Sequence, residues 1–250
     1  MERPRIVVTL TNPERAADRS TAELKNRRYL ESVERAGGVA VPLDDATSTA
    51  ERTSALASMD GLVISGGADV DPALYHERMA GARDLDPDRD RLDGDAFRAA
   101  QDRSLPVLGV CRGLQAINVL SGGSLLQHVD GHESRPYPSV PADQHSIQIV
   151  GGTRLASIVG GADALLVNTY HHQAVTADRL APSLIASASA ADPAGELVEA
   201  LESRDPDRWL VGIQSHPERT ESSPIVLERL WAAFVAAALD RRSRAAVDRR

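Results

Sequence analysis

The stretch PVLGVCRGLQAINVLSGG, residues 106–123, decides the fold of this chain. An apolar run typical of a buried strand, Val107–Val110, leads directly into Cys111, and a helical pattern follows at once. Gly109 and Gly113 flank the cysteine at two residues on either side. This spacing is typical of a nucleophile elbow, a sharp strand-to-helix turn that presents a reactive side chain.

Such an elbow would give the cysteine a distinctive environment. The first N–H groups of the new helix and the positive end of its dipole would point at the sulfur, which predicts a lowered pKa for the Cys111 thiol and a reactive thiolate. The alternative is a buried cysteine that serves as a small apolar residue, the usual fate of a free cysteine. This motif alone leaves both interpretations open.

Outward from the elbow, short apolar runs alternate with helical patterns, which is the signature of an α/β sheet. Central strands are predicted at Ile6–Leu10, Val39–Leu43, Gly61–Ser65, Pro106–Val110 and Leu210–Gln214. The helices between them are predicted at Ala22–Ala36, Ala50–Ala57 and Leu92–Arg103. Further strands, expected as antiparallel additions, are Ser146–Val150, Leu165–Val167, Leu184–Ala188 and Leu197–Leu201.

Element boundaries are predicted from cap residues and charge. Asp90 is expected to cap the helix that follows it, and residues 83–91 to form a charged loop. Ser223 and Pro224 are expected to open the closing helix as its cap and first-turn residue. The polar tail after Asp240, residues 241–250, is expected to be frayed.

Bulk composition limits the class of protein. With 250 residues and a formal net charge of −8, one domain over residues 1–240 is expected, and a nucleic-acid partner is not. Neither a signal peptide nor a run of roughly 18 apolar residues is visible, so a cytoplasmic protein without a membrane partner is expected. The single cysteine excludes an internal disulfide and cysteine-cluster metal sites. The oligomeric state stays open, a homodimer included.

A histidine follows the last predicted central strand. In VGIQSHPE, residues 211–218, the strand delivers His216 at its end, and Glu218 lies two residues on. A thiol nucleophile needs an imidazole to take up its proton and return it to the leaving group, and the imidazole needs a carboxylate or amide to fix its tautomer. The alternative is a surface loop with one histidine, which the elbow cysteine upstream disfavours.

A pair of glycines ends another predicted strand. In LVISGGADVDP, residues 62–72, Gly66 and Gly67 let the backbone approach a ligand closely. Ligands of open sheets gather at the carboxyl ends of the strands, so this turn, the elbow and the histidine are expected to line one rim. The N–H groups of Gly67 and Arg112 are then natural donors to an oxyanion. An ordinary Gly-Gly turn is the alternative.

Polar residues in other segments could line the same pocket. Adjacent histidines and a glutamine occur in VNTYHHQAV, residues 167–175, with Gln-His-Ser upstream at 144–146. These residues suggest a pocket wall, a structural polar turn or a metal site, although no familiar zinc spacing is present. Asp69 and Asp71 are expected to cap the following turn or to recognise an amine.

Four motifs together resemble the class I glutamine amidotransferase-like superfamily, and within it most of all the gamma-glutamyl-gamma-aminobutyrate hydrolase family. They are SGGADVDP at 65–72, GVCRGLQ at 109–115, NTYHHQ at 168–173 and QSHPE at 214–218. The similarity spans roughly residues 5–238 in the family's motif order. It implies a flavodoxin-like α/β fold of three layers, with a mostly parallel central sheet, helices on both faces and antiparallel additions.

The resemblance also implies roles for individual residues. Cys111 would be the nucleophile, His216 the base and Glu218 the orienting carboxylate, with Gly67 and Arg112 in the oxyanion hole. The residues implied to hold the substrate are Gln115, Tyr170, His171, His172 and Gln173. Ser215 stands where relatives often carry Trp or another bulky residue, which could widen the pocket. No cofactor and no metal are expected.

The implied reaction is acyl transfer through a thioester. A gamma-glutamyl amide, as small-molecule substrate, would acylate the cysteine and release an amine, and water would then release glutamate. This hydrolase would serve polyamine catabolism, a related route, or the removal of a gamma-glutamyl protecting group. One alternative is a glutaminase subunit that passes ammonia to a partner. Another is a catalytically silent ligand-binding module.

Overall fold

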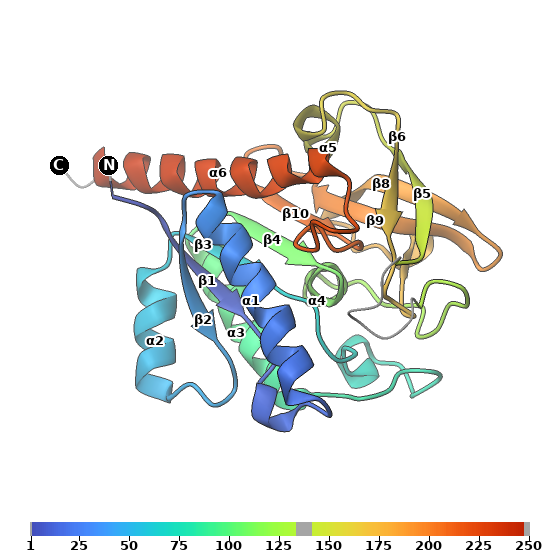
Figure 1. Ribbon diagram of the computed structural model, residues 1–250, viewed down its shortest axis with the longest axis horizontal. Helices are drawn as coiled ribbons and strands as arrows, with labels where there is room; N and C mark the ends of the chain where they lie inside the picture. The colour runs from blue at the N-terminus through green and yellow to red at the C-terminus, as the bar shows by residue number, and fades with distance from the viewer. Residues whose placement is uncertain (1, 134–141, 248–250) are drawn as a thin grey trace.

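The computed structural model describes residues 2–133 and 142–247. Within them the chain forms one ten-stranded sheet in the order β2-β1-β3-β4-β10-β9-β8-β5-β6, with β7 paired to β9 (Figure 1). Neighbouring strands from β2 to β10 are parallel, and the pairs from β10 to β6 are antiparallel. The predicted α/β class, with a parallel centre and antiparallel additions, is therefore confirmed.

The elements alternate along the chain as the sequence predicts for the parallel half. The strands are β1 Arg5–Thr9, β2 Val39–Leu43, β3 Gly61–Ile64, β4 Val107–Val110, β5 Gln144–Ile149, β6 Ala164–Asn168, β7 Val175–Thr176, β8 Leu184–Asp192, β9 Gly195–Ser203 and β10 Leu210–Ile213. The α-helices are α1 Arg19–Arg35, α2 Thr49–Ser58, α3 Pro87–Asp102, α4 Arg112–Leu120, α5 Arg154–Ile158 and α6 Glu228–Val247. Short 3-10 helices are η1 Pro13–Arg15, η2 Pro72–Tyr75, η3 Ala177–Arg179 and η4 Ile225–Leu227.

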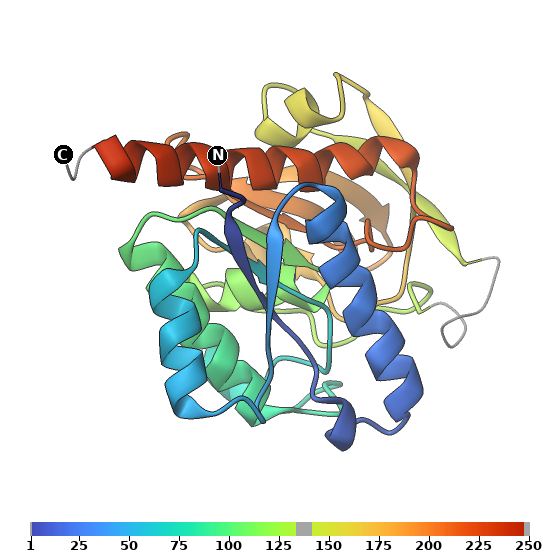
Figure 2. The same ribbon diagram turned by 60° about the vertical axis from the view of Figure 1, so that its left-hand side comes forward.

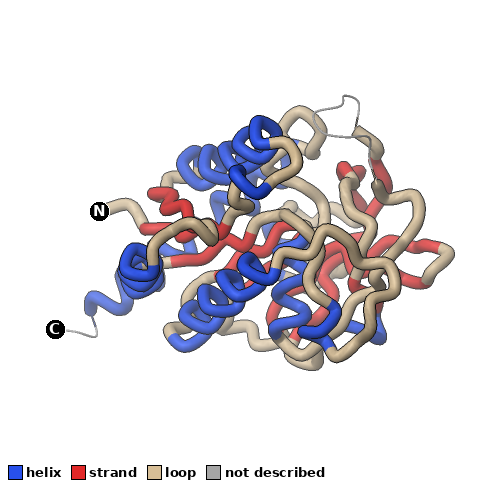
Figure 3. The backbone as a smooth tube through the Cα atoms, turned by 90° about the horizontal axis from the view of Figure 1, so that it is seen from below, coloured by secondary structure: helices blue, strands red, loops and turns tan. Residues whose placement is uncertain are grey.

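The sheet is buried on both faces, as a parallel sheet requires. Along β1, Val7 packs in one hydrophobic cluster, while Ile6 and Val8 pack in another on the opposite face. The first cluster includes buried residues of α2, α3 and α4, and the second includes those of α1, α5 and α6. Figures 2 and 3 show the strands running between helices on either side.

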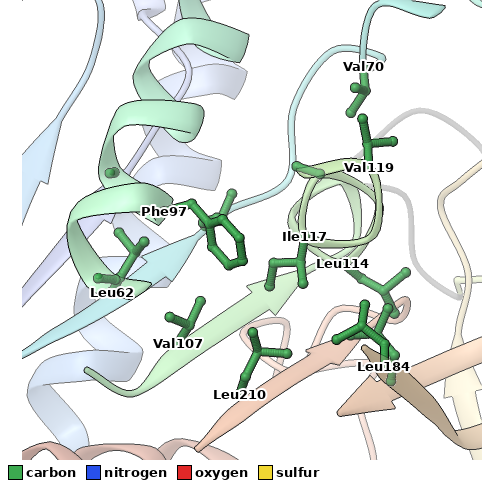
Figure 4. Packing of buried hydrophobic residues seen from close by; sticks show 14 of the residues in the cluster. Leu62, Val70, Phe97, Val107, Leu114, Ile117, Val119, Leu184 and Leu210 are labelled. Carbon is green, nitrogen blue, oxygen red and sulfur yellow. The ribbon is translucent and has the colours of Figure 1, made fainter. Parts of the chain in front are cut away.

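Helix α4, which follows Cys111, is buried along almost its whole length. Leu114 and Ile117 point from it toward the strands, beside Val107 of β4 and Leu210 of β10 (Figure 4). Burial of these side chains stabilises the helix far more than intrinsic propensity would. The core therefore holds α4 in place, and with it the turn that carries Cys111.

Strand β10 enters the sheet between β4 and β9, although it lies far downstream in the sequence. Its register pairs Ile213 with Val110, and the Cys111 N–H donates to the Ile213 carbonyl at 2.8 Å. Since β3 pairs with the other edge of β4, the segments after β3, β4 and β10 leave the sheet at one rim. The predicted meeting of these three strand ends is confirmed.

Two predicted boundaries on α3 are wrong. The helix begins at Pro87, and its cap is Asp86, whose side chain accepts the Arg89 N–H. Asp90 is therefore an internal helical residue rather than the cap, and only the first part of the predicted charged loop, residues 83–91, is non-helical. Proline at the first helical position favours this earlier start. The charged residues of the first turns of α3 have partners that the sequence does not reveal.

The closing helix also differs from expectation at both ends. Pro224, rather than Ser223, is the cap residue of η4, and its side chain makes no capping bond. Helix α6 continues beyond Asp240 to Val247, where the sequence predicts a frayed end, and residues 248–250 lie outside the described structure. Arg241 and Arg242 extend it by donating to the carbonyls of Arg103 and Arg3, each at 3.0 Å. In the described residues, no helix combines the length and apolarity needed to cross a membrane.

Candidate active site

Cys111 occupies a strained elbow between β4 and α4. Its backbone has φ 53° and ψ −110°, a left-handed conformation that a residue with a Cβ adopts only at an energetic cost. A Cβ on Gly109 would lie 2.6 Å from the Gly113 carbonyl oxygen, and one on Gly113 only 1.9 Å from that of Ile64. Both flanking glycines are thus required by close backbone packing, as the elbow motif predicts.

Gly66 lies between the cysteine and the histidine. A Cβ placed on it would be 3.8 Å from the Cβ of Cys111 and 3.4 Å from Cε1 of His216. The same Cβ would lie 2.9 Å from the hydroxyl of Tyr29, which accepts the Gly66 N–H at 3.1 Å. The absence of a side chain at this position leaves room between the two groups whose proximity the chemistry needs.

His216 is held by a carboxylate and by an asparagine. Its Nδ1 lies 2.7 Å from Oε1 of Glu218, and both side chains are buried. The side chain of Asn168, at the end of β6, accepts the His216 N–H at 2.8 Å and donates to its carbonyl at 3.1 Å. The imidazole is therefore fixed from its ring and from its backbone.

The protonation of this pair follows from its surroundings. Burial raises the pKa of Glu218, but the neighbouring His216 and Arg219 outweigh it, and the net shift is downward. Burial lowers the pKa of His216, with a further contribution from Arg219. An ionised Glu218 facing a neutral His216 fixes the proton on Nδ1, which leaves Nε2 as the basic nitrogen.

The thiol does not behave as the elbow motif predicts. Cys111 is only 7% exposed, and burial raises the pKa of its thiol to about 12. The Arg112 N–H and the positive charge of Arg219 oppose this shift without cancelling it. The predicted lowering of the thiol pKa is therefore wrong, because desolvation outweighs the helix N-terminus. A neutral thiol of this kind would have to lose its proton to a base before it could act as a nucleophile.

This arrangement predicts an unusual pH dependence for alkylation of the cysteine. Because pH 6–9 lies below the thiol pKa, the alkylation rate by iodoacetamide should rise about tenfold per pH unit across it. Since the pKa of His216 is lowered, activity should decline only below the ordinary histidine pKa of about 6.5. The single cysteine makes the labelling measurement unambiguous, with Cys111→Ala as the blank. An alkylation rate that levels off below neutral pH would instead indicate a preformed thiolate.

The two predicted oxyanion donors come from two segments: Arg112 begins α4 directly after Cys111, and Gly67 lies in the loop after β3. The Gly66 N–H is occupied by Tyr29, so this amide is not free to bind an oxyanion, and Gly67 remains the candidate donor of its loop. A Cβ on Gly67 would lie 3.2 Å from Cδ of Arg112, so the two residues are in contact distance. An oxyanion hole formed by the main-chain N–H groups of these two residues stays a prediction.

A buried network of four charges holds Arg112 in place. Its guanidinium pairs with Asp90 and Asp93, and Asp93 also accepts from Nε of Arg89 at 3.0 Å. Arg89 in turn donates to the carbonyls of Thr9 and Ser65, both at 3.1 Å. The Arg112 side chain is thus tied to α3 and, through Arg89, to the ends of β1 and β3. Its backbone N–H is the part that remains available to the site.

The segments implied to hold substrate lie close to the catalytic groups. The Tyr170 ring meets the His216 ring edge-on, with centroids 5.5 Å apart. The guanidinium of Arg219 lies over the Tyr170 ring, 3.9 Å from its centroid. Gln115 donates from Nε2 to the Gln173 carbonyl at 3.0 Å and to the Gln214 side chain at 3.1 Å. These contacts join the segment 168–173 to the elbow helix and to the end of β10.

The two adjacent histidines diverge. His172 reaches Asp69 of the Gly-Gly loop at 3.0 Å, so it belongs to the wall of the candidate pocket. His171 turns instead to Glu199 of β9 and away from that loop. Asp71 accepts the Ala73 N–H and caps η2, as expected, whereas Asp69 accepts from Arg83 and His172.

Some site residues have no signal in the sequence. Tyr29 comes from an amphipathic helix, where an aromatic residue predicts only core packing, yet its hydroxyl also lies 3.4 Å from Nδ1 of His216. Arg89 and Asp93 read as ordinary surface charges of a helix. Asn168 lies in the motif run, although nothing in its spacing indicates a bond to the His216 backbone. Ser215 is 2% exposed, and its hydroxyl has no hydrogen-bond partner among the described residues.

Two hollows of the surface lie away from Cys111. One of about 580 Å³ is lined by Phe97, Ser121 and Leu210, at the start of β10 and so at the opposite end of that strand from His216. Another of about 720 Å³ is lined by residues of β2 and α2. Because neither brings reactive groups together, we place the candidate site at Cys111, where the chemistry converges.

The chain is similar to several known proteins in sequence and to solved structures in fold. The chain is 37% identical over 215 residues to a protein of Mycobacterium tuberculosis named "Putative glutamine amidotransferase Rv2859c", and the match covers 84% of this chain and 66% of that protein. It is 29% identical over 221 residues to the gamma-glutamyl-gamma-aminobutyrate hydrolase PuuD of Escherichia coli, which covers 84% of each chain. Among solved structures, the glutaminase domain of Trypanosoma brucei CTPS with bound acivicin has the same fold, with a TM-score of 0.63 at 18% identity over 95% of this chain and 94% of that one.

A family model completes the comparison. The model of the Peptidase C26 family matches residues 6–218, a range that begins in β1 and ends at Glu218. It therefore includes the elbow, the Gly-Gly loop and the His216 segment. On this match, the chain belongs to the Peptidase C26 family, among the class I glutamine amidotransferase-like proteins.

Proposed function

We propose that this chain hydrolyses the gamma-glutamyl amide bond of a small gamma-glutamyl amine through a thioester on Cys111. The observation that carries the proposal is the buried contact of 2.7 Å between His216 and Glu218, at the end of the strand that pairs with the strand of Cys111. An oriented imidazole beside an elbow cysteine is the arrangement that acyl transfer needs. The similarity to the E. coli hydrolase supports a gamma-glutamyl amide as the substrate class.

The reaction begins with loss of the thiol proton. His216 takes this proton from Cys111 as the sulfur attacks the gamma-carbonyl carbon, and the carbonyl electron pair moves onto oxygen. The N–H groups of Gly67 and Arg112 stabilise that oxyanion, and the loss of one such donor typically costs about 2.7–4 kcal/mol. His216 then protonates the departing amine, and the C–N bond breaks to leave a thioester.

The second half of the reaction uses the same groups. His216 removes a proton from water, which attacks the thioester carbonyl and forms a second oxyanion in the same place. Collapse of this intermediate breaks the C–S bond, releases glutamate and returns the proton to the Cys111 sulfur. Each positioned proton transfer contributes about 10²–10⁴-fold to the rate.

The choice of donor separates this proposal from its main alternative. A glutaminase that passes ammonia to a partner is favoured by the name of the M. tuberculosis relative. Ammonia is the smallest leaving amine, whereas a pocket built for an alkyl amine gains from each buried methylene. We therefore expect kcat/KM for gamma-glutamyl-gamma-aminobutyrate to exceed that for glutamine by about 10–200-fold.

The measurement is glutamate release by the purified chain, with glutamine and with a panel of gamma-glutamyl amides of increasing amine size. Bulky amines belong in the panel because Ser215 is small where relatives often carry a bulky residue. Cys111→Ala protein serves as the blank for contaminating hydrolases. A preference for glutamine would favour the amidotransferase subunit. Absence of turnover on every amide, with slow alkylation of the thiol at all pH values, would favour a silent binding module.

A further inference from the structure

Three histidines and a glutamate form a second polar cluster, apart from the residues used in the proposed reaction. His145 lies in β5, Glu199 in β9 and His171 just after β6, and His132 precedes the undescribed segment 134–141. One side-chain nitrogen or oxygen from each of the four lies within 4.8 Å of all the others. Four separate stretches of chain thus direct metal-binding atoms toward one point.

The atoms at the centre of this cluster lack hydrogen bonds. Nε2 of His145, Nε2 of His171 and Oε1 of Glu199 are buried, and none has a hydrogen-bond partner within the described residues. The nearest approaches are 3.4 Å from His145 Nε2 and 3.8 Å from His171 Nε2 to the Glu199 carboxylate. Since native proteins rarely leave several buried polar atoms unsatisfied in one place, these atoms indicate an additional group between them.

The position of the proton on His171 indicates that its Nε2 can bind a cation. Its Nδ1 lies 2.9 Å from the Gln173 carbonyl, which can only accept, so Nδ1 carries the proton and Nε2 presents a lone pair. The same Nε2 lies 3.8 Å from Oε1 of Glu199, and two lone pairs that face each other in this way are unfavourable unless a cation lies between them.

The surrounding contacts are those of oriented metal ligands. Metal-binding histidines commonly donate their other ring N–H to a backbone carbonyl, which fixes the ring, and His171 makes this contact with the Gln173 carbonyl. Each ring nitrogen of His132 has a polar partner: Nδ1 lies 3.5 Å from the Thr169 hydroxyl, and Nε2 lies 3.3 Å from Asp192. Whichever nitrogen binds the metal, the other can therefore keep a contact that orients the ring. Its ring also packs against those of His145 and His171, with centroids 4.7 and 4.8 Å away.

We propose that His132, His145, His171 and Glu199 bind one divalent transition-metal ion, with zinc as the best match. Three imidazoles and one carboxylate form a tetrahedral set that zinc accepts, whereas magnesium and calcium prefer oxygen ligands. At ordinary zinc bond lengths, ligand atoms lie about 3.3 Å apart, so the 3.4 Å between His145 and Glu199 already fits and the rest of the set contracts modestly.

Four protein ligands leave no open position, which defines a structural rather than a catalytic site. The ion would join β5, β9 and the segment after β6 at the antiparallel end of the sheet. The Glu199 carbonyl accepts the Gln214 N–H at 2.8 Å, two residues before His216, so the site would brace the platform next to the catalytic histidine. The sequence indicates it only weakly: a metal site is one of three interpretations of the segments that carry His145 and His171, and the four ligands are spread over strands and loops with no familiar zinc spacing.

The test is metal analysis and thermal unfolding of the full chain, purified without a histidine tag or chelator. We expect about one zinc per chain by mass spectrometry, and zinc added to chelator-stripped protein should raise Tm by about 5–10 °C. Cobalt substitution should give the intense visible absorption of a tetrahedral site. Glu199→Gln and His145→Gln should each weaken zinc binding by at least about 100-fold, since even supporting contacts are worth 10–100-fold.

His76→Asn is the matched control, because His76 is exposed, caps η2 and lies outside the cluster. It should keep the zinc content and the zinc-dependent rise in Tm. Should Glu199→Gln fail to fold, His145→Gln decides alone, since its side chain is 20% exposed and can be replaced with little strain. Zinc-free protein whose Tm does not respond to added zinc would overturn the proposal, as would full zinc content in His145→Gln.

Discussion

Cys111→Ala is expected to lower kcat/KM for a gamma-glutamyl amide by at least about 10⁴-fold, because no covalent intermediate can form without the sulfur. The fold should survive, since alanine keeps the Cβ and meets the same backbone strain at φ 53°. The measurement is the initial rate of glutamate release over a range of substrate concentrations, alongside the melting temperature. Wild-type turnover by a folded Cys111→Ala protein would refute the proposed mechanism.

Cys111→Gly sharpens the same experiment by separating strain from chemistry. Glycine tolerates the positive φ of the elbow, so relief of strain should raise Tm by about 2–4 °C, less whatever packing the thiol contributes. Activity should be lost as in the alanine variant. A gain in stability together with a loss of turnover would mean that the cysteine is kept in this conformation for its reactivity. A clear fall in Tm would show that the thiol mainly packs the core.

The second large effect is expected at Asp93, where a buried carboxylate lies between two buried arginines. Asp93→Ala leaves Arg89 and Arg112 with one carboxylate, Asp90, and removal of one partner from a buried ionic network typically costs about 3–5 kcal/mol. For a chain of this size Tm should fall by about 6–20 °C. Urea unfolding, followed by tryptophan fluorescence, measures the free energy of unfolding. The values for the variant and the wild-type protein should be compared with one common m-value.

Asp95→Ala on the same helix is the matched control. Asp95 pairs with Arg98 at 3.3 Å, but both side chains are more than half exposed, so the pair is screened by water. The change should alter the free energy of unfolding by less than about 0.5 kcal/mol. Equal effects of the two substitutions would show that the buried network contributes no more than an ordinary surface ion pair. A selective loss at Asp93 would also identify what holds the Arg112 N–H in place.

The sequence alone determined the α/β class, the central strands and the elbow. Those features depend on local patterns: apolar runs of strand length, glycines spaced around Cys111, and a histidine and a glutamate at the end of a later strand. A local pattern can be read without knowing what packs against it. The four motifs also predicted the family, because they occur together in one order.

Only the tertiary structure decided what surrounds those residues. The placement of β10 against β4 brings His216 to Cys111, and burial at that junction raises the thiol pKa that the elbow pattern predicts to be low. Tyr29 and Asp93 read as helix residues until α1 and α3 pack beside the loop after β3. His171 and Glu199 meet only when the antiparallel strands assemble. Desolvation and pairing of distant charges depend on three-dimensional neighbours, and the linear order of residues does not contain them.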